Sequence, residues 1–211
     1  FIIPLIMERR EILKWIALYT GSAMIGGEFL LSGCKAPTGK DIGFSKTDLS
    51  LLNETGETII PATDTPGARA ANVAKVMEVV VRDCYWPEHQ KAFMEGIKQI
   101  DVESNKDFGK DFMSATAEER TKLLNKLEEV AKKFNEEVDK KDEPKRKEME
   151  EKDKGFDFIS SPKHYYTMMK QLTMLAYFSS EECLTKAFIY MPVPGKYDGA
   201  YKWKSGDKLF S

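Results

Sequence analysis

The sequence has few of the residues that most often carry catalytic or metal-binding chemistry. Its 211 residues include only two histidines, His89 and His164, and three cysteines. It has no glycine-rich dinucleotide loop, no phosphate-binding loop and no Cys-x-x-Cys-His haem motif. A zinc site needs three or four ligands, and the two histidines lie on different predicted helices without further ligands nearby. We therefore expect no cofactor, metal or catalytic residue in this chain.

The sequence also lacks an excess of charge of either sign. It contains 32 Lys and Arg residues against 34 Asp and Glu residues, which gives a formal net charge of −2. A general nucleic-acid binder shows a basic excess, so we expect no nucleic-acid partner. The length fits one ordinary domain, or one domain preceded by a signal segment.

Residues 1–34 contain the three parts of an export signal. The twin arginines Arg9-Arg10 precede a mostly apolar stretch, Trp15–Leu31, and Leu31-Ser32-Gly33-Cys34 resembles a lipobox. We predict export by the twin-arginine route, with Cys34 carrying a lipid that anchors the periplasmic protein to the membrane. The first residues, 1–6, precede Met7, which we expect to be the true start.

Two alternatives for this N-terminal segment remain open. Its length is close to that of a membrane span, so it is compatible with an uncleaved anchor. It also suits an amphipathic helix that packs on the domain. Glu28 lies within the apolar stretch, where a charge is costly in a bilayer.

The remainder reads as a tether, 35–44, followed by a helical domain, 45–211. No stretch shows the alternation typical of a strand, so the predicted fold class is all-α, an irregular helical bundle with an extended C-terminal tail from Tyr190. The spacing of apolar residues, prolines and capping residues predicts six helices. The first covers Asp48–Asn53, with Thr47 as its N-cap and Gly56 as the residue that ends it. The others run from Pro66 to Asp83, from Pro87, from Ala117, after Ser161-Pro162, and over Glu181–Phe188.

Three of these helices have a clear apolar stripe. The stripes comprise Val73, Val76, Met77, Val80 and Val81; Phe93, Ile97 and Ile100; and Leu123, Leu127, Val130 and Phe134. The nearly all-charged stretch 139–154, broken by Pro144, indicates a solvated helix end or a mobile hairpin. The methionine-rich and aromatic run Tyr165–Phe178 is more typical of a core than of a cofactor site.

The stretch Ile59–Ala68, IIPATDTPGA, reads as a shaped loop. Pro61 and Pro66 each fix φ and disfavour helix in the residue before them. Thr65 suits an N-cap and Pro66 a first helical position. Asp64 is expected to hold the turn by accepting backbone N–H groups. Two interpretations stay open, a rigid entry to a helix or a docking loop with a functional carboxylate.

This loop resembles the signature of the small subunit, subunit 3, of the gluconate 2-dehydrogenase family. Two further blocks agree with the resemblance in order and spacing. They are Leu172-Thr173 with Tyr177–Glu181, and Tyr190–Gly199. The resemblance covers about residues 45 to 200.

The resemblance implies a non-catalytic subunit of a periplasmic dehydrogenase complex for sugars or sugar acids. In such complexes a large flavoprotein holds FAD and oxidises the substrate, and a multihaem cytochrome c usually accepts the electrons. The small subunit is thought to carry the export signal and to help its partner fold. The alternative is a stand-alone envelope lipoprotein that binds another protein. The expected partner interface consists of Pro61, Thr63, Asp64, Thr65, Pro66, Gly67, Tyr190, Pro194, Gly195 and Tyr197.

Cys84 and Cys183 are the two cysteines that remain after Cys34. No activating motif surrounds either, so catalysis through a Cys/His pair is not favoured. An oxidising compartment favours a disulfide between them, and two buried free thiols are the alternative.

Overall fold

The computed structural model describes residues 42–152, 158–191, 193, 195, 199–202 and 204–210. All of them belong to one compact unit that begins at Ile42. The predicted signal segment with Cys34 lies outside the described residues, and so do Pro194 and Tyr197. The helices are α2 (Lys46–Ile59), α3 (Val73–Cys84), α4 (Pro87–Phe108), η1 (Phe112–Ser114), α5 (Ala117–Lys152), α6 (Tyr165–Phe178) and η2 (Cys183–Ala187).

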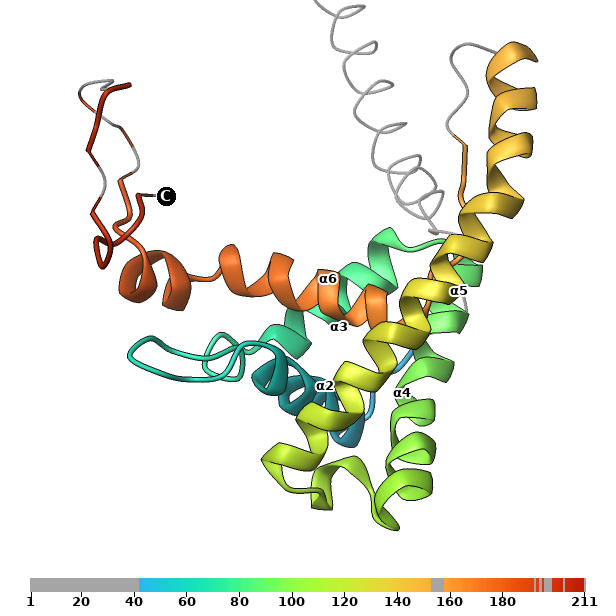
Figure 1. The fold of residues 1–211 in the computed structure, drawn as a ribbon, viewed down its shortest axis with the longest axis horizontal. Coiled ribbons are helices and arrows are strands. Elements are labelled where there is room, and N and C mark those ends of the chain that lie inside the picture. Colours follow the sequence, from blue (N-terminus) through green and yellow to red (C-terminus); the bar gives the residue numbers. More distant parts are fainter. Residues whose placement is uncertain are drawn as a thin grey trace, which may run out of the picture. The chain divides into compact units, whose positions relative to one another are not determined.

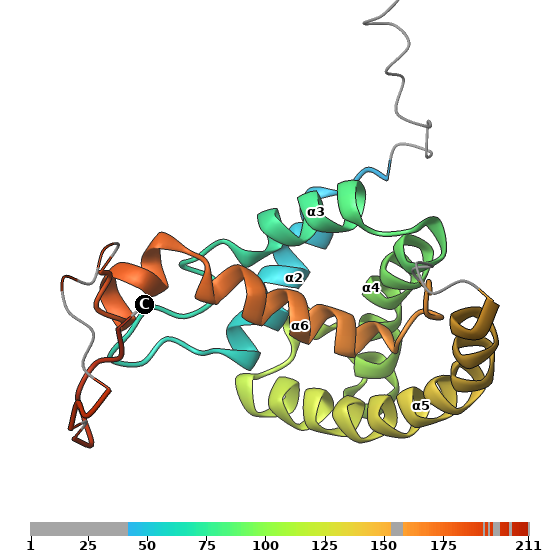
Figure 2. The same cartoon turned by 90° about the horizontal axis from the view of Figure 1, so that it is seen from above.

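The all-α prediction is confirmed. Figures 1 and 2 show the helices, with α6 running between α3 and α5. Helix α6 contacts α2, α3, α4 and α5, and it is therefore the central element of the core. The only β feature among the described residues is an isolated bridge between Ile189 and Phe210. The Ile189 N–H donates to the Leu209 carbonyl at 2.8 Å, so the C-terminal tail doubles back on itself.

Helix α2 is longer than predicted at both ends. Ser45, not Thr47, is the N-cap, and it forms a reciprocal capping box with Asp48. Gly56 does not end the helix but lies buried inside it. A Cβ there would lie 2.7 Å from Cγ2 of Val73, so the glycine allows the start of α3 to approach closely. Gly56 serves the packing of α2 against α3, so the prediction that it ends the helix is wrong.

Helix α3 starts at Val73 and not at Pro66, so the prediction that Thr65 caps it is wrong. Its N-cap is Asn72, in the left-handed region with a φ of 49°. The amide oxygen of Asn53, on α2, accepts the N–H of Ala74 at 3.1 Å. The cap interaction therefore comes from another helix, and local sequence signals do not reveal it.

The starts of α4 and α5 agree with the sequence. Pro87 occupies the first turn of α4. At α5 the Thr116 N–H donates to Glu119 at 2.7 Å, and the Glu119 N–H donates to the Thr116 hydroxyl at 3.3 Å. Pro144 does not break α5, which continues to Lys152 along an exposed flank.

The predicted apolar stripes of α3 and α5 are only partly buried. Val76 is exposed on α3. On α5, Leu123 and Leu127 are buried, but Val130 is 47% exposed and Phe134 is 44% exposed. Leu124 and Ala131 join the core in their place. The apolar stripe of α5 thus leaves the core in its second half.

Helix α6 begins at Tyr165, not directly after Ser161-Pro162. His164 is its N-cap, because its side chain accepts the N–H of Tyr166. Ser161 instead donates its backbone N–H and its hydroxyl to the carboxylate of Asp142, a buried residue on α5, at 2.6 and 2.8 Å. The predicted cap residue is therefore used to attach this segment to α5.

The candidate disulfide is absent, because Cys84 and Cys183 are both free thiols. Cys84 is exposed at the end of α3, whereas Cys183 is fully buried in η2, after α6. The alternative of two buried thiols is right for Cys183 and wrong for Cys84. The predicted short helix over Glu181–Phe188 is a single π-helical turn, Cys183–Ala187.

Candidate functional site

The loop between α2 and α3, residues 60–72, is held by one carboxylate of α2. Glu57 Oε1 accepts the N–H of Ala62 at 2.9 Å, and Glu57 Oε2 accepts the N–H of Arg69 at 2.8 Å. The Ala68 N–H donates to the Ile60 carbonyl at 2.9 Å. Since hydrogen bonds to a charged acceptor are stronger than neutral ones, Glu57 fixes both ends of the loop.

Gly67 lies where the loop passes closest to this carboxylate. A Cβ at Gly67 would lie 2.5 Å from the backbone nitrogen of Ala62 and 2.5 Å from Glu57 Oε2. No side chain fits there unless the carboxylate or the backbone moves. The glycine is thus required by packing against the Glu57 carboxylate.

A tyrosine of α6 attaches the loop to the core. The Tyr177 hydroxyl donates to the Pro66 carbonyl at 2.7 Å, and the Tyr177 ring is buried. Burial raises the pKa of Tyr177, so its hydroxyl stays protonated and available as a donor. Burial also raises the pKa of the neighbouring Cys183 thiol, which makes this cysteine a structural and unreactive one.

The far end of the loop is tied to the start of α5 through Glu54. Glu54 Oε2 pairs with Arg69 at 2.5 Å, and Glu54 Oε1 pairs with Arg120. Arg120 also donates from Nε to the Phe112 carbonyl at 3.0 Å. This network joins α2, the loop, η1 and α5, and it explains how the loop keeps one shape while its tip faces outward.

The predicted loop residues fall into two groups. Pro61, Thr63 and Asp64 are exposed, whereas Gly67 is buried and Thr65 and Pro66 are half-buried. Asp64 makes no hydrogen bond with any described residue, so its predicted role in holding the turn is wrong. Glu57 has that role instead. The exposed tip carries Asp64 outward, which leaves its carboxylate available to a partner.

Sequence reasoning missed Glu57, Glu54 and Arg120. All three act across distances in the chain that no local motif marks. Tyr177 lies inside the second block of the family resemblance, and that block was the one available signal for its contact with the loop.

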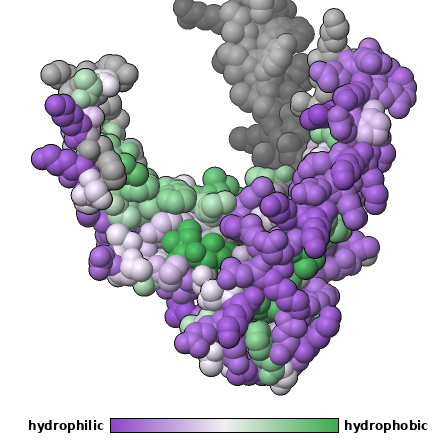
Figure 3. All heavy atoms as spheres, in the orientation of Figure 1, coloured by the Kyte–Doolittle hydropathy of each residue, from purple (hydrophilic) through white to green (hydrophobic). Residues whose placement is uncertain are grey.

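The outward face of α6 is apolar, although surface helices usually expose polar residues. Leu175 is 55% exposed and Phe178 is 48% exposed, and Met174 is exposed beside them. Phe178 stacks on Phe188, with ring centroids 6.0 Å apart. Figure 3 shows an apolar band along α6 that continues toward the tail. The prediction that the whole run Tyr165–Phe178 is core is therefore only partly right.

The loop and this face lie at the same end of the described unit. Tyr177 joins the loop to the last turn of α6, and Figures 1 and 2 both place the loop beside η2. Tyr190 and Gly195, from the predicted tail interface, are exposed. We call the exposed loop tip 61–64 together with Met174, Leu175 and Phe178 the docking face.

The described residues hold no group of three or more His, Cys, Asp or Glu side chains arranged to bind a metal ion. No helix in this part of the chain is long and apolar enough to cross a membrane.

A comparison with known protein families identifies a match. The sequence model described as gluconate 2-dehydrogenase subunit 3 matches residues 46–195, a range that includes the loop, Glu57 and α6. No curated protein and no solved structure matches the chain.

Proposed function

The chain belongs to the gluconate 2-dehydrogenase subunit 3 family, and from this membership we propose that it is the non-catalytic small subunit of an FAD-dependent dehydrogenase complex for sugars or sugar acids. The family match over 46–195 carries this proposal. The docking face supports the proposal, because contiguous apolar patches on a protein surface usually mark sites of interaction with another protein. The large subunit would hold FAD and oxidise the substrate, and a third subunit with haem c would accept the electrons.

The proposed location is the periplasm, on the membrane. It rests on the twin arginines and on Leu31-Ser32-Gly33-Cys34, with a lipid on Cys34 as the anchor. In this scheme the small subunit assists the folding and assembly of the flavoprotein, and the folded complex is exported by the twin-arginine route.

The docking face is the proposed contact with the large subunit. Its loop is shaped before binding, because Glu57, Tyr177 and the Glu54 network already hold it. A pre-shaped loop lowers the ordering cost of association. Binding would bury the apolar side chains of α6 and remove them from water. The charge of Asp64 would help to fix the relative alignment of the two subunits.

Purification from the native membrane tests this proposal. We expect a yellow, flavin-containing protein much larger than this chain to co-purify with it, and mass spectrometry to find a lipid on Cys34. Purification of the chain alone, or with an envelope protein that lacks flavin, would favour the alternative of a stand-alone lipoprotein.

A further inference from the structure

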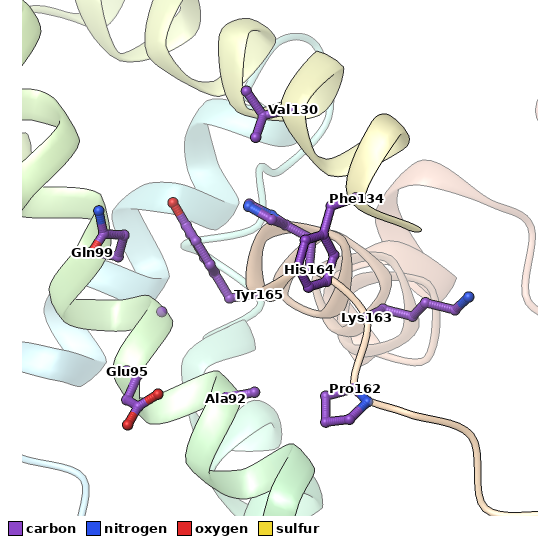
Figure 4. Close-up of a pocket in the computed structure, with 10 residues that line it drawn as sticks. Ala92, Glu95, Gln99, Val130, Phe134, Pro162, Lys163, His164 and Tyr165 are labelled. Atoms are coloured by element: carbon purple, nitrogen blue, oxygen red, sulfur yellow. The ribbon is translucent and has the colours of Figure 1, made fainter. Parts of the chain in front are cut away.

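A second feature, separate from the docking face and independent of the proposed function, is a cavity of about 400 Å³ between α4, α5 and the segment before α6. This volume lies in the range of small-molecule sites in proteins. Figure 4 shows the side chains around it, with Val130 and Phe134 coming from α5 and Gln99 from α4.

One wall of the cavity is apolar. Val130 and Phe134 are the two stripe residues of α5 that the core does not bury. Ala92 and Pro162 complete this wall. The rest of the exposed surface of α5 is dominated by charged residues, so the two apolar side chains stand out. An occupant with an apolar surface would remove them from water.

Beside this wall the cavity presents two neutral hydrogen-bond donors, since the ring centroid of His164 lies 5.5 Å from that of Phe134. His164 Nδ1 accepts the N–H of Tyr166 at 3.3 Å, which leaves the proton of the neutral ring on Nε2. Burial lowers the pKa of His164 and raises the pKa of Tyr165, so both groups stay neutral at neutral pH. Figure 4 shows the nitrogen edge of His164 and the Tyr165 hydroxyl directed into the same part of the cavity. The Tyr165 hydroxyl has no hydrogen-bond partner among the described residues.

These two groups are held in place by their surroundings. The backbone N–H of His164 donates to Oδ1 of Asn135 at 2.9 Å, and the ring centroids of His164 and Tyr165 lie 4.3 Å apart. A Cβ at Gly96 would lie 2.2 Å from Cβ of Tyr165, so the glycine lets Tyr165 lie against α4. The donors are therefore part of a built site, not of mobile side chains.

The charges around the cavity disfavour an anion. Lys163 pairs with Asp139, outside the cavity. The amide of Gln99 donates to Glu103 at 3.2 Å, and Glu103 pairs with Lys126 at 3.6 Å. Glu95, at the rim, pairs with Lys91 at 4.0 Å, so the described residues of the cavity offer no unpaired cation to an anion. A neutral occupant avoids unfavourable interactions with these carboxylates.

We propose that this cavity binds a small, neutral molecule that has an apolar body and a carbonyl group at one edge. The apolar body packs against Val130 and Phe134, and the carbonyl oxygen accepts hydrogen bonds from His164 Nε2–H and the Tyr165 hydroxyl.

A pair of probes tests this proposal on the ¹⁵N-labelled full chain. We would titrate 1-indanone, a neutral bicyclic ketone, and indane, which has the same rings without the carbonyl. 1-Indanone should cause saturable changes in the ring signals of His164 and in the amides of Val130 and Phe134. The only other histidine, His89, lies outside the cavity lining and serves as the internal reference.

Three variants sharpen the result. Tyr165→Phe keeps the ring and removes the donor, so it should weaken 1-indanone binding roughly threefold to tenfold, as expected for one hydrogen bond, and leave indane unaffected. Val130→Phe fills the cavity and should abolish binding of both probes. Val79→Phe enlarges an exposed valine on α3 and should change neither.

The proposal is overturned if 1-indanone causes no saturable change up to its solubility limit, or if Val130→Phe leaves binding intact. Equal affinity for indane and 1-indanone would overturn the assignment of His164 and Tyr165 as donors.

Discussion

At the scale of single residues, the loop depends on contacts that permit little substitution. Glu57 accepts two backbone N–H groups at once, and Gly67 fits only because it has no side chain. Ala62 and Arg69 are exposed, so the effect rests on the bonds themselves: a hydrogen bond to a charged acceptor contributes more to stability than a neutral one. Two substitutions test this arrangement.

Glu57→Gln should lower the free energy of unfolding by about 1–3 kcal/mol, because the amide offers one oxygen where the carboxylate offers two. Amide hydrogen exchange at Ala62 and Arg69 should become faster. Glu136→Gln is the matched control, since Glu136 is exposed on α5 and has no hydrogen-bond partner among the described residues. Unchanged exchange at both amides would show that Glu57 does not hold the loop.

Gly67→Ala should also destabilise the protein, by about 1–3 kcal/mol, since the added methyl group forces the loop or the Glu57 carboxylate to move. Gly43→Ala is the control, because a Cβ at Gly43 meets nothing within 4 Å. Chemical denaturation of the two variants gives the comparison. Equal stability of both would mean that the close contact at Gly67 relaxes freely.

At the scale of helices, the sequence predicts two starts whose deciding interaction is local, although the equally local capping box of Ser45 and Asp48 was not recognised. Pro87 marks the start of α4, and the Thr116–Glu119 capping box marks the start of α5. The start of α3 is set by Asn53 on another helix, so no pattern near Val73 could locate it. The same limit applies to the candidate site, where the loop was recognisable but Glu57 was not.

Periodicity has a second limit, visible on α5 and α6. An apolar stripe shows which face of a helix avoids water, but not what covers that face. Val130 and Phe134 belong to the stripe of α5 and line a cavity. Leu175 and Phe178 belong to an apolar helix and face outward. These positions become informative only when the fold shows which apolar residues the core leaves uncovered.

Gly56→Ala tests the packing of α2 against α3. In an exposed helix this change usually stabilises by up to about 1 kcal/mol. Here the new Cβ would lie 2.7 Å from Val73 and 3.3 Å from Ala68, and overpacking costs about 1–3 kcal/mol. We expect a net loss of stability in thermal unfolding. A higher melting temperature would show that the two helices separate easily.

The capping box of α5 should make stability depend on acidic pH. Hydrogen bonds from Lys110 and from the Thr116 backbone lower the pKa of Glu119 to about 2, from an ordinary value of 4.5. Because the folded pKa is the lower one, this contribution is present above about pH 4.5 and is lost as the pH falls toward 2.

In Glu119→Gln, the free energy of unfolding should therefore decrease less between pH 4.5 and pH 2 than it does in the wild type. Denaturation at a series of pH values, with Glu118→Gln as the control in the same helical turn, measures this effect. The same slope in wild type and Glu119→Gln would argue against the lowered pKa.

At the scale of the whole molecule, the proposed partner protein would account for both the exposed apolar face of α6 and the shaped loop. Leu175→Glu places a charge in the centre of the docking face and should weaken association with the large subunit at least about tenfold. Val102→Glu is the control, since Val102 on α4 is also 55% exposed. Equal loss of association in both variants would count against this face as the contact.

Asp64→Ala removes the carboxylate at the tip of the loop without touching any contact that holds the loop. It should reduce assembly or export of the large subunit and leave its flavin content unchanged. The ratio of exported to retained flavoprotein, measured by flavin absorbance, gives the result. If the flavin content falls while assembly is normal, Asp64 acts on the partner's cofactor site instead.

The most direct test of the subunit assignment is expression of the large flavoprotein with and without this chain. Dehydrogenase activity in the exported fraction is measured with an artificial electron acceptor, so that no cytochrome is needed. The account predicts that exported activity is lost without this chain and restored when it is supplied. Full exported activity of a stable large subunit in its absence would contradict the account.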